Sequence, residues 1–178
     1  MIEELARPVG QSDIAGLADV LIDAVDGGAS VSFLAPLSAD RAQQWWRDTL
    51  AGADGRAAFI VARDDAGIVG TVQLHPAWAP NQPHRAEIAK LLVHRRARRR
   101  GLGRALMDYA EARARRAGFT LLTLDTKRGD SAERLYEGSG WVRAGLIPEY
   151  ALNPDGSPGD TVIFYKQLRP QIGSRESG

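Results

Sequence analysis

The sequence of 178 residues contains no cysteine. That absence excludes disulfide bridges, a thiolate nucleophile and metal sites with cysteine ligands. Histidine is scarce too, and His75, His84 and His94 lack the spacing of a metal site, so we predict no bound metal. No run of about eighteen apolar residues occurs, and the first residues lack the basic start and apolar stretch of a secretory signal. We therefore expect a cytoplasmic protein with no membrane partner.

An excess of charge of either sign is also absent, because 23 lysines and arginines balance 22 acidic residues to a net charge of +1. Hydrophobic residues make up 44% of the chain and charged residues 25%, as in ordinary globular proteins. The length suits one domain with its own core, and no change in composition marks a linker. We predict a single domain over residues 1–168 and a polar, flexible tail over residues 169–178.

The spacing of apolar residues predicts helices and strands of an α/β protein. In the N-terminal half, apolar residues recur every three or four positions and then give way to two short apolar runs around an Asp/Gly turn. In the C-terminal half, a strand, a helix and a second strand follow one another, which implies a parallel strand pair. We expect helices over residues 14–25, 38–51, 101–117 and 131–137, and strands over residues 57–62, 68–74, 86–93, 119–125, 141–144 and 161–166.

Positive charge is concentrated just before the third expected helix. Six arginines lie within ten positions there, and the helix begins at a glycine-containing turn. Helix-start N–H groups lack intrahelical partners and lie at the positive end of the helix dipole, so they stabilise a phosphate that glycines allow to approach. A solvated loop or a nucleic-acid patch is the alternative interpretation. The arginines are Arg95, Arg96, Arg98, Arg99, Arg100 and Arg104.

Three phosphate-binding patterns fit this segment to different degrees. A Walker A loop requires Lys and then Ser or Thr after its second glycine, but Arg104 and Ala105 follow Gly103. A Rossmann fingerprint requires a third glycine where Leu106 stands, and the long stretch before Gly101 does not suit its tight first turn. The third pattern, Arg-x-x-Gly-x-Gly, is matched in the expected strand, loop and helix setting.

That third pattern resembles the coenzyme A loop of GCN5-related N-acetyltransferases, with Arg98, Gly101 and Gly103 at the matching positions. These enzymes often carry an acid near the start of the preceding strand, as Glu87 is here. They also often carry Ala-x-x-Leu-Tyr followed by Gly-Phe/Trp, which ends here in Tyr136 and in the Gly-Trp pair at 140–141. Within the family, the stretches 84–94 and 150–156 look like those of tabtoxin-resistance acetyltransferases.

The resemblance implies a mixed sheet of about six or seven strands, flanked by helices, in which two central parallel strands splay apart. It implies acetyl-coenzyme A as acetyl donor and direct attack by a primary amine of a small, amino-acid-like or antibiotic-like molecule. One alternative is acetylation of a protein or peptide amine. Another is a non-catalytic module that binds acyl-coenzyme A or nucleic acid. Whether the protein forms a homodimer is left open. The cofactor-binding residues implied are Leu91, Leu92, Val93, Arg98, Arg99, Arg100, Gly101, Leu102, Gly103 and Arg104.

Three residues are candidates for catalysis under this resemblance. Glu87 would be the base that frees the amine, or else an ordinary surface carboxylate. Tyr136 would protonate the departing thiolate, or else serve as a core aromatic. Asp125, expected at the end of a buried strand, would orient the amine, or else form a cap or pair with Lys127 or Arg128.

Some positions depart from the family pattern or stay open. Arg95 stands where many members have proline. Gly129 stands where many have asparagine, and Asp130 either replaces that asparagine or caps the next helix. Four aromatic residues could line an acceptor pocket, although aromatics at such spacing also build cores. They are Trp45, Trp46, Trp78 and Tyr150.

Overall fold

The computed structural model describes residues 1–168 of the chain, so the predicted tail at 169–178 lies outside the described residues. Strands and helices are interspersed along the chain, with one short 3-10 turn before the third helix. The elements are β1 (Ile2–Glu4), α1 (Gln11–Asp26), α2 (Ala39–Ala51), β2 (Ala58–Asp64), β3 (Gly67–Pro76), β4 (Arg85–Val93), the 3-10 turn Arg95–Ala97, α3 (Leu102–Arg116), β5 (Leu121–Lys127), α4 (Ser131–Glu137), β6 (Val142–Leu152) and β7 (Pro158–Gln167).

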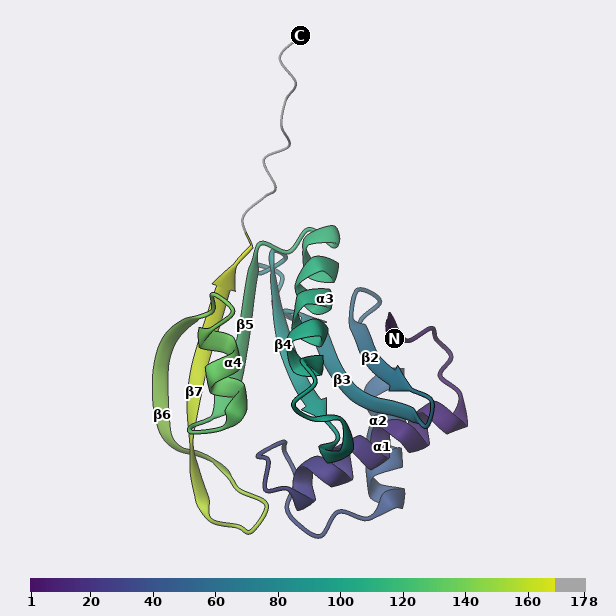
Figure 1. Ribbon diagram of the computed structural model, residues 1–178. Coiled ribbons are helices and arrows are strands. Elements are labelled where there is room, and N and C mark those ends of the chain that lie inside the picture. The colour runs from purple at the N-terminus through teal and green to yellow at the C-terminus, as the bar shows by residue number, and fades with distance from the viewer. Residues whose placement is uncertain (169–178) are drawn as a thin grey trace.

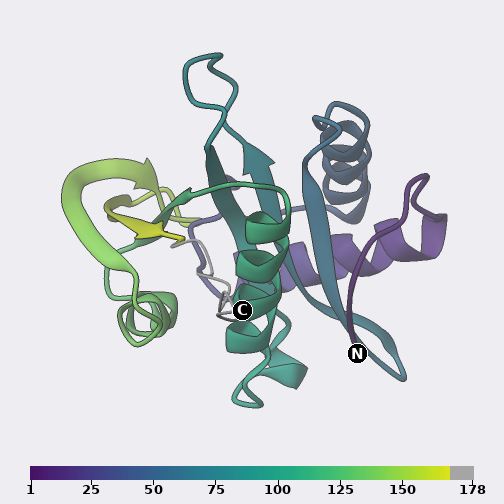
Figure 2. The same ribbon diagram turned by 90° about the horizontal axis from the view of Figure 1, so that it is seen from above.

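A seven-stranded mixed sheet in the order β1-β2-β3-β4-β5-β7-β6 forms the middle layer (Figure 1). Only β4 and β5 pair in parallel, and α3 connects them. Figure 2 shows α3 and α4 on one side of the strands and α2 on the other. This arrangement confirms the predicted α/β class and the predicted parallel pair.

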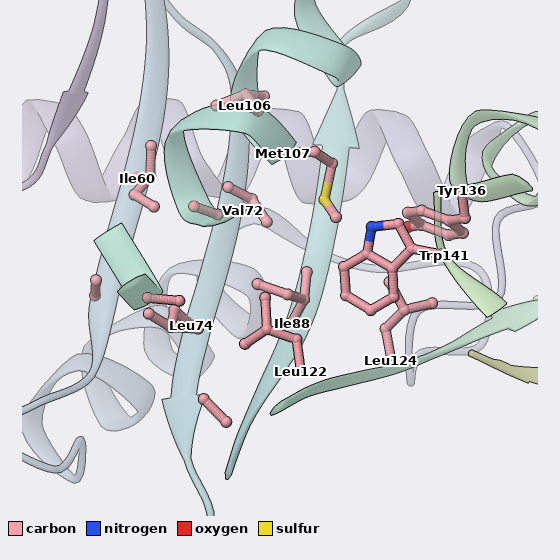
Figure 3. Packing of buried hydrophobic residues seen from close by; sticks show 14 of the residues in the cluster. Ile60, Val72, Leu74, Ile88, Leu106, Met107, Leu122, Leu124, Tyr136 and Trp141 are labelled. Carbon is pink, nitrogen blue, oxygen red and sulfur yellow. The ribbon is translucent and has the colours of Figure 1, made fainter. Parts of the chain in front are cut away.

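Each face of the sheet carries its own apolar core. Ile60, Val72 and Ile88 point towards α3, where Leu106 and Met107 complete the cluster (Figure 3). On the opposite face α1 and α2 cover the alternate positions of β2 and β3. Successive strand residues point to opposite faces, so one strand supplies both cores.

The sheet differs from the predicted strands mainly at its edges. The three-residue strand β1 was not predicted, and β6 is far longer than the predicted 141–144. Most β6 side chains are exposed, so this edge strand lacks the apolar alternation that marks a half-buried strand. The prediction for 119–125 was also wrong in one respect: only Leu122 and Leu124 of β5 are buried, so one face of this strand is open.

A buried ion pair fastens α3 to the C-terminal part of the sheet. Lys166 Nζ donates a hydrogen bond of 2.7 Å to each carboxylate oxygen of Glu111 in α3. Trp141 Nε1 donates to the same carboxylate at 3.1 Å. Lys166 also donates to the Ser139 carbonyl oxygen at 2.7 Å. The ion pair therefore holds the segment that follows α4. Trp141, which belongs to this segment, packs against Tyr136.

Replacing Lys166 with methionine should strongly destabilise the fold, because the Glu111 carboxylate would stay buried without its closest cation. We expect a loss of about 3 kcal/mol in the free energy of unfolding, measured by urea denaturation. Asp108→Asn is the control, since Asp108 and its partner Arg104 are both more than half exposed at 62% and 52%. A loss in Lys166→Met no larger than in the control would contradict this assignment.

Candidate active site

The central parallel strands separate soon after they begin to pair. Their register covers only Arg85–Glu87 of β4 against Leu121–Thr123 of β5. Farther along, a bulge interrupts the pairing of β4 with β3, and Lys90 there has a left-handed φ of 50°. A bulge bends its strand and increases the twist. The result is the predicted splay, and a cleft of about 850 Å³ opens between the strands.

The cleft brings most of the predicted site residues together. Its walls come from the loop after α1, from β4, from the arginine-rich loop, and from the segment between β5 and α4. Arg100 and Arg104 were predicted as cofactor contacts but lie outside the lining. The predicted residues that line it are Glu87, Leu91, Leu92, Val93, Arg98, Arg99, Gly101, Leu102, Gly103, Asp125 and Tyr136.

The loop before α3 presents free peptide donors to this cleft. Within the described residues, no acceptor is hydrogen-bonded to the backbone amides of residues 99–104. Arg99 and Gly101 adopt left-handed φ values of 60° and 74°, and Gly101 caps α3 without a side chain. Glycine is the residue that tolerates this conformation most readily. The loop thus has the donors and the helix dipole that a diphosphate requires.

A buried aspartate on α1 holds this loop in place. Asp23 accepts a hydrogen bond from the Arg95 amide at 2.9 Å and is also bonded to the Arg95 guanidinium. Arg98 Nη2 donates to Asp23 at 3.3 Å, while Arg98 Nε donates to the Val93 carbonyl at 2.9 Å. The Arg98 side chain therefore fixes the conformation of the loop. The sequence analysis did not identify Asp23 as a residue of the site. Its only sequence signal was an acid within the apolar stripe of a helix.

Other arginines of the cluster have separate partners. Arg96 pairs with Asp64, the last residue of β2, at 2.5 Å. Arg104 donates to the Gly138 carbonyl at 3.2 Å and so connects α3 with the end of α4. These contacts divide the positive charge among several structural tasks, which disfavours the continuous patch that nucleic acid would need.

The two candidate acids lie on the same face of the parted strands. Ala86 and Ile88 pack on the α3 side, so Glu87 between them points to the α1 side. Glu87 pairs in register with Thr123, and Asp125 follows two residues later on the same face. Desolvation by the cleft wall raises the pKa of Glu87 above its ordinary value, and the Asp125 charge raises it further.

The structure corrects the expectations for Asp125. This residue is exposed at the cleft and does not end its strand, which continues to Lys127. Neither predicted ion pair forms, because Arg128 pairs with Asp160 at 3.2 Å and Lys127 Nζ donates to the Gly28 carbonyl at 3.4 Å. Asp130 does cap α4, accepting from the Ala132 amide at 3.3 Å.

Tyr136 belongs both to the core and to the cleft. Its ring is buried, with centroids 6.0 Å from Trp141 and 5.7 Å from Phe164, and it lines the cleft (Figure 3). Burial raises the pKa of the phenol above its ordinary value, and the charges of Asp130 and Asp125 raise it further. The hydroxyl therefore stays protonated at neutral pH, as a proton donor must.

The four aromatic residues considered for an acceptor pocket are not brought together. Trp46 is fully buried, whereas Trp78 is 91% exposed in the loop between β3 and β4. Trp45 packs on Phe33 and Trp46, and Tyr150 is exposed on β6. None of the four lines the cleft. Also, within residues 1–168, no group of three or more His, Asp or Glu side chains could hold a metal ion, and no helix is long and apolar enough to cross a membrane.

Residues 28–141 match the Acetyltransferase (GNAT) family. This range includes the loop after α1, the arginine-rich loop and α4. The chain belongs to this family. A GNAT enzyme uses acetyl-coenzyme A as acetyl donor, and the free amides of residues 99–104 beside a widening cleft fit that molecule's diphosphate and extended arm.

Individual relatives agree with this membership. An uncharacterised N-acetyltransferase of Azospirillum brasilense, from the hisH-hisA intergenic region, is 33% identical over 117 residues, which cover 65% of this chain and 68% of the relative. The solved ribosomal-protein-alanine N-acetyltransferase of Brucella melitensis has a TM-score of 0.78 at 20% identity, covering 94% of this chain and 99% of its own. The protein yncA of Salmonella typhimurium, solved with its cofactor acetyl-CoA, has a TM-score of 0.76 at 19% identity, covering 97% and 96%.

Asp23→Asn should weaken coenzyme A binding, because the neutral amide cannot hold the two loop arginines as the carboxylate does. We expect the Kd from calorimetry to rise about tenfold, equal to the loss of one charge-assisted hydrogen bond. Asp19→Asn is the matched control, since Asp19 lies one turn earlier on α1 with a side chain 67% exposed. A folded Asp23→Asn variant with unchanged affinity would show that the loop is shaped by other contacts.

Proposed function

We propose that this GNAT enzyme acetylates a primary amine of a small molecule by direct attack within a ternary complex. The observation that carries the proposal is the meeting of Glu87 and Tyr136 in one cleft, although they come from opposite faces of the sheet. Strands that stayed paired would separate the two groups. Their parting allows an acid and a base to approach one reaction centre.

The donor would lie along the parted edge of β4. The amides of residues 99–104 would hold its diphosphate, and the arm would extend beside Leu91, Leu92 and Val93. The Leu91 amide, next to the bulge, would donate to the thioester oxygen as it gains negative charge. One such donor contributes on the order of a hundredfold or more to rate.

The chemistry requires one proton to leave the amine and one to reach the sulfur. Glu87, directly or through a water, would take the proton that the attacking amine must lose. The new bond joins nitrogen to the acetyl carbon, the carbon–sulfur bond breaks, and Tyr136 would donate a proton to the departing sulfur. The products are an amide and free coenzyme A, with no covalent enzyme intermediate. Asp125 would help to orient the incoming amine.

Two hydrogen bonds between distant loops of the chain favour a small acceptor over a protein segment. The Ala35 amide donates to the Pro154 carbonyl at 2.8 Å, and Ser30 Oγ donates to the Leu152 carbonyl at 3.3 Å. The loop between α1 and α2 is thus joined to the turn between β6 and β7. This joined wall reaches the cleft at Ser30, and we infer that it limits the room for a polypeptide acceptor.

A thiol-release assay with acetyl-coenzyme A and a panel of small amines and short peptides tests the proposal. Turnover that is faster with small amines than with peptides is expected. Retained coenzyme A binding without turnover of any acceptor would instead favour a binding module, and exclusive peptide turnover would favour the protein acceptor.

Tyr136→Phe should lower kcat about a hundredfold and leave the Kd for coenzyme A nearly unchanged, because only the proton donor is removed. Steady-state kinetics and calorimetry measure the two quantities. Tyr109→Phe is the matched control, since Tyr109 lies on α3 outside the cleft lining. A full kcat in Tyr136→Phe would remove this tyrosine from the acid role.

The pH profile of kcat/KM should report the raised pKa of Glu87. A base acts only when deprotonated, so activity should fall as pH falls through a value above that of an ordinary glutamate. Glu87→Gln should abolish this acid limb and lower the rate about a hundredfold. Glu137→Gln, at an exposed position of α4, should keep the profile. An acid limb that survives in Glu87→Gln would assign the base to another group.

A further inference from the structure

Lys90 occupies an unusual backbone position in the middle of the cleft wall. It lies at the β4 bulge, where its φ of 50° is left-handed. A non-glycine residue in this conformation is uncommon and costs free energy, so such residues gather where a side chain must be aimed. Here the bulge turns Lys90 into the cleft that Glu87 and Asp125 also line.

The Lys90 ammonium is held in place but only partly satisfied. Its Nζ donates to Ser32 Oγ at 3.0 Å and lies 5.7 Å from the centroid of the Trp45 ring, within cation–π range. Within residues 1–168, no carboxylate lies within 4.0 Å of it. An ammonium has three N–H donors, so two remain for a ligand.

The charges around Lys90 show which region it faces. Burial lowers its pKa, while the charges of Asp125 and Glu87 raise it. The Lys90 charge in turn adds to burial in lowering the pKa of His75, which pairs in register with Glu87. The wall of the cleft therefore carries two carboxylates together with one partly buried ammonium.

We propose that Lys90 is a specificity-determining residue that binds a carboxylate on the acceptor, so that the preferred acceptors are amino acids. This inference rests on the proposed function, since it concerns the acceptor of the same reaction. A partly buried ammonium that lacks a carboxylate partner gains from an anionic ligand, and two free donors suit a carboxylate. An acceptor that carries both charges matches both ends of the site: its amine lies near Glu87 and Asp125, and its carboxylate on Lys90.

The same ammonium would oppose other amines. A diamine or polyamine would place its second cation near Lys90, where like charges repel. Lys90 would therefore select in two ways, through attraction of carboxylates and repulsion of cations. A merely structural Lys90, which fastened Ser32 and the α1–α2 loop, would affect all acceptors alike.

Matched acceptor pairs separate these roles. ω-Amino acids of increasing length are compared with their primary amides, which have nearly the same amine but no negative charge, and with diamines. We expect wild-type kcat/KM to favour the best amino acid over its amide about tenfold or more, as one charge-assisted hydrogen bond predicts. Lys90→Met should lose this preference, chiefly through a higher acceptor KM, and should keep its kcat/KM for the amides.

Two control variants accompany Lys90→Met. Methionine keeps the unbranched chain and the same left-handed strain, so Lys90→Met tests the charge. Lys90→Arg should retain part of the preference. Lys127→Met removes another lysine from the cleft wall, one bonded to the Gly28 carbonyl, and should keep the preference. Coenzyme A affinity, measured by calorimetry, should be equal in all variants.

Two results would overturn the inference alone: an unchanged ratio of acid to amide in Lys90→Met, or an equal loss on both members of each pair. Faster turnover of diamines than of amino acids by the wild type would do the same. No turnover of any acceptor by a wild type that binds coenzyme A would instead overturn the proposed function, and the inference would fall with it.

Discussion

The early end of pairing between β4 and β5 is the constraint on which the site depends. Beyond Glu87 and Thr123 the two strands share no register, and the bulge at Lys90 turns β4 away from its neighbour. A continuous sheet would satisfy these main-chain groups and seal its two faces from each other. The opening leaves donors and acceptors of β4 free for a ligand and lets side chains from both faces reach one space.

Buried carboxylates keep the two sides of this opening in place. Asp23 ties the arginine-rich loop to α1, and Glu111 ties α3 to Lys166 and to the segment after α4. Each carboxylate is satisfied by several donors, which a buried charge requires. The arginine-rich loop and Tyr136 are thereby held relative to each other, although neither acid lines the cleft.

Charge in the cleft is divided according to task. The amides of residues 99–104 suit a diphosphate, while the side chains of Arg95, Arg96, Arg98 and Arg104 bind other groups of this chain. Elsewhere in the cleft, Glu87 and Asp125 supply negative charge and Lys90 supplies positive charge, while burial raises the pKa of the Tyr136 phenol above its ordinary value. The site thus combines a general electrostatic requirement of GNAT enzymes with a local arrangement of charges that we propose distinguishes one amine from another.

The sequence by itself determined the class of the fold, the membership of the family and most of the segments that line the cleft, but not the loop after α1. These properties depend on local signals: the apolar period, the glycines at 101 and 103, and the order of strand, loop and helix. Only the tertiary structure decided that Asp23 binds Arg98, that Asp125 is exposed, and that Lys90 lines the same cleft as the two acids. These features join residues that are distant in the chain or follow from a strand bulge. The pattern of apolar residues along one segment predicts neither long-range contacts nor bulges. Edge strand β6 was incompletely predicted for a related reason, because its exposed side chains bear no periodic apolar signal and its hydrogen bonds to β7 define it.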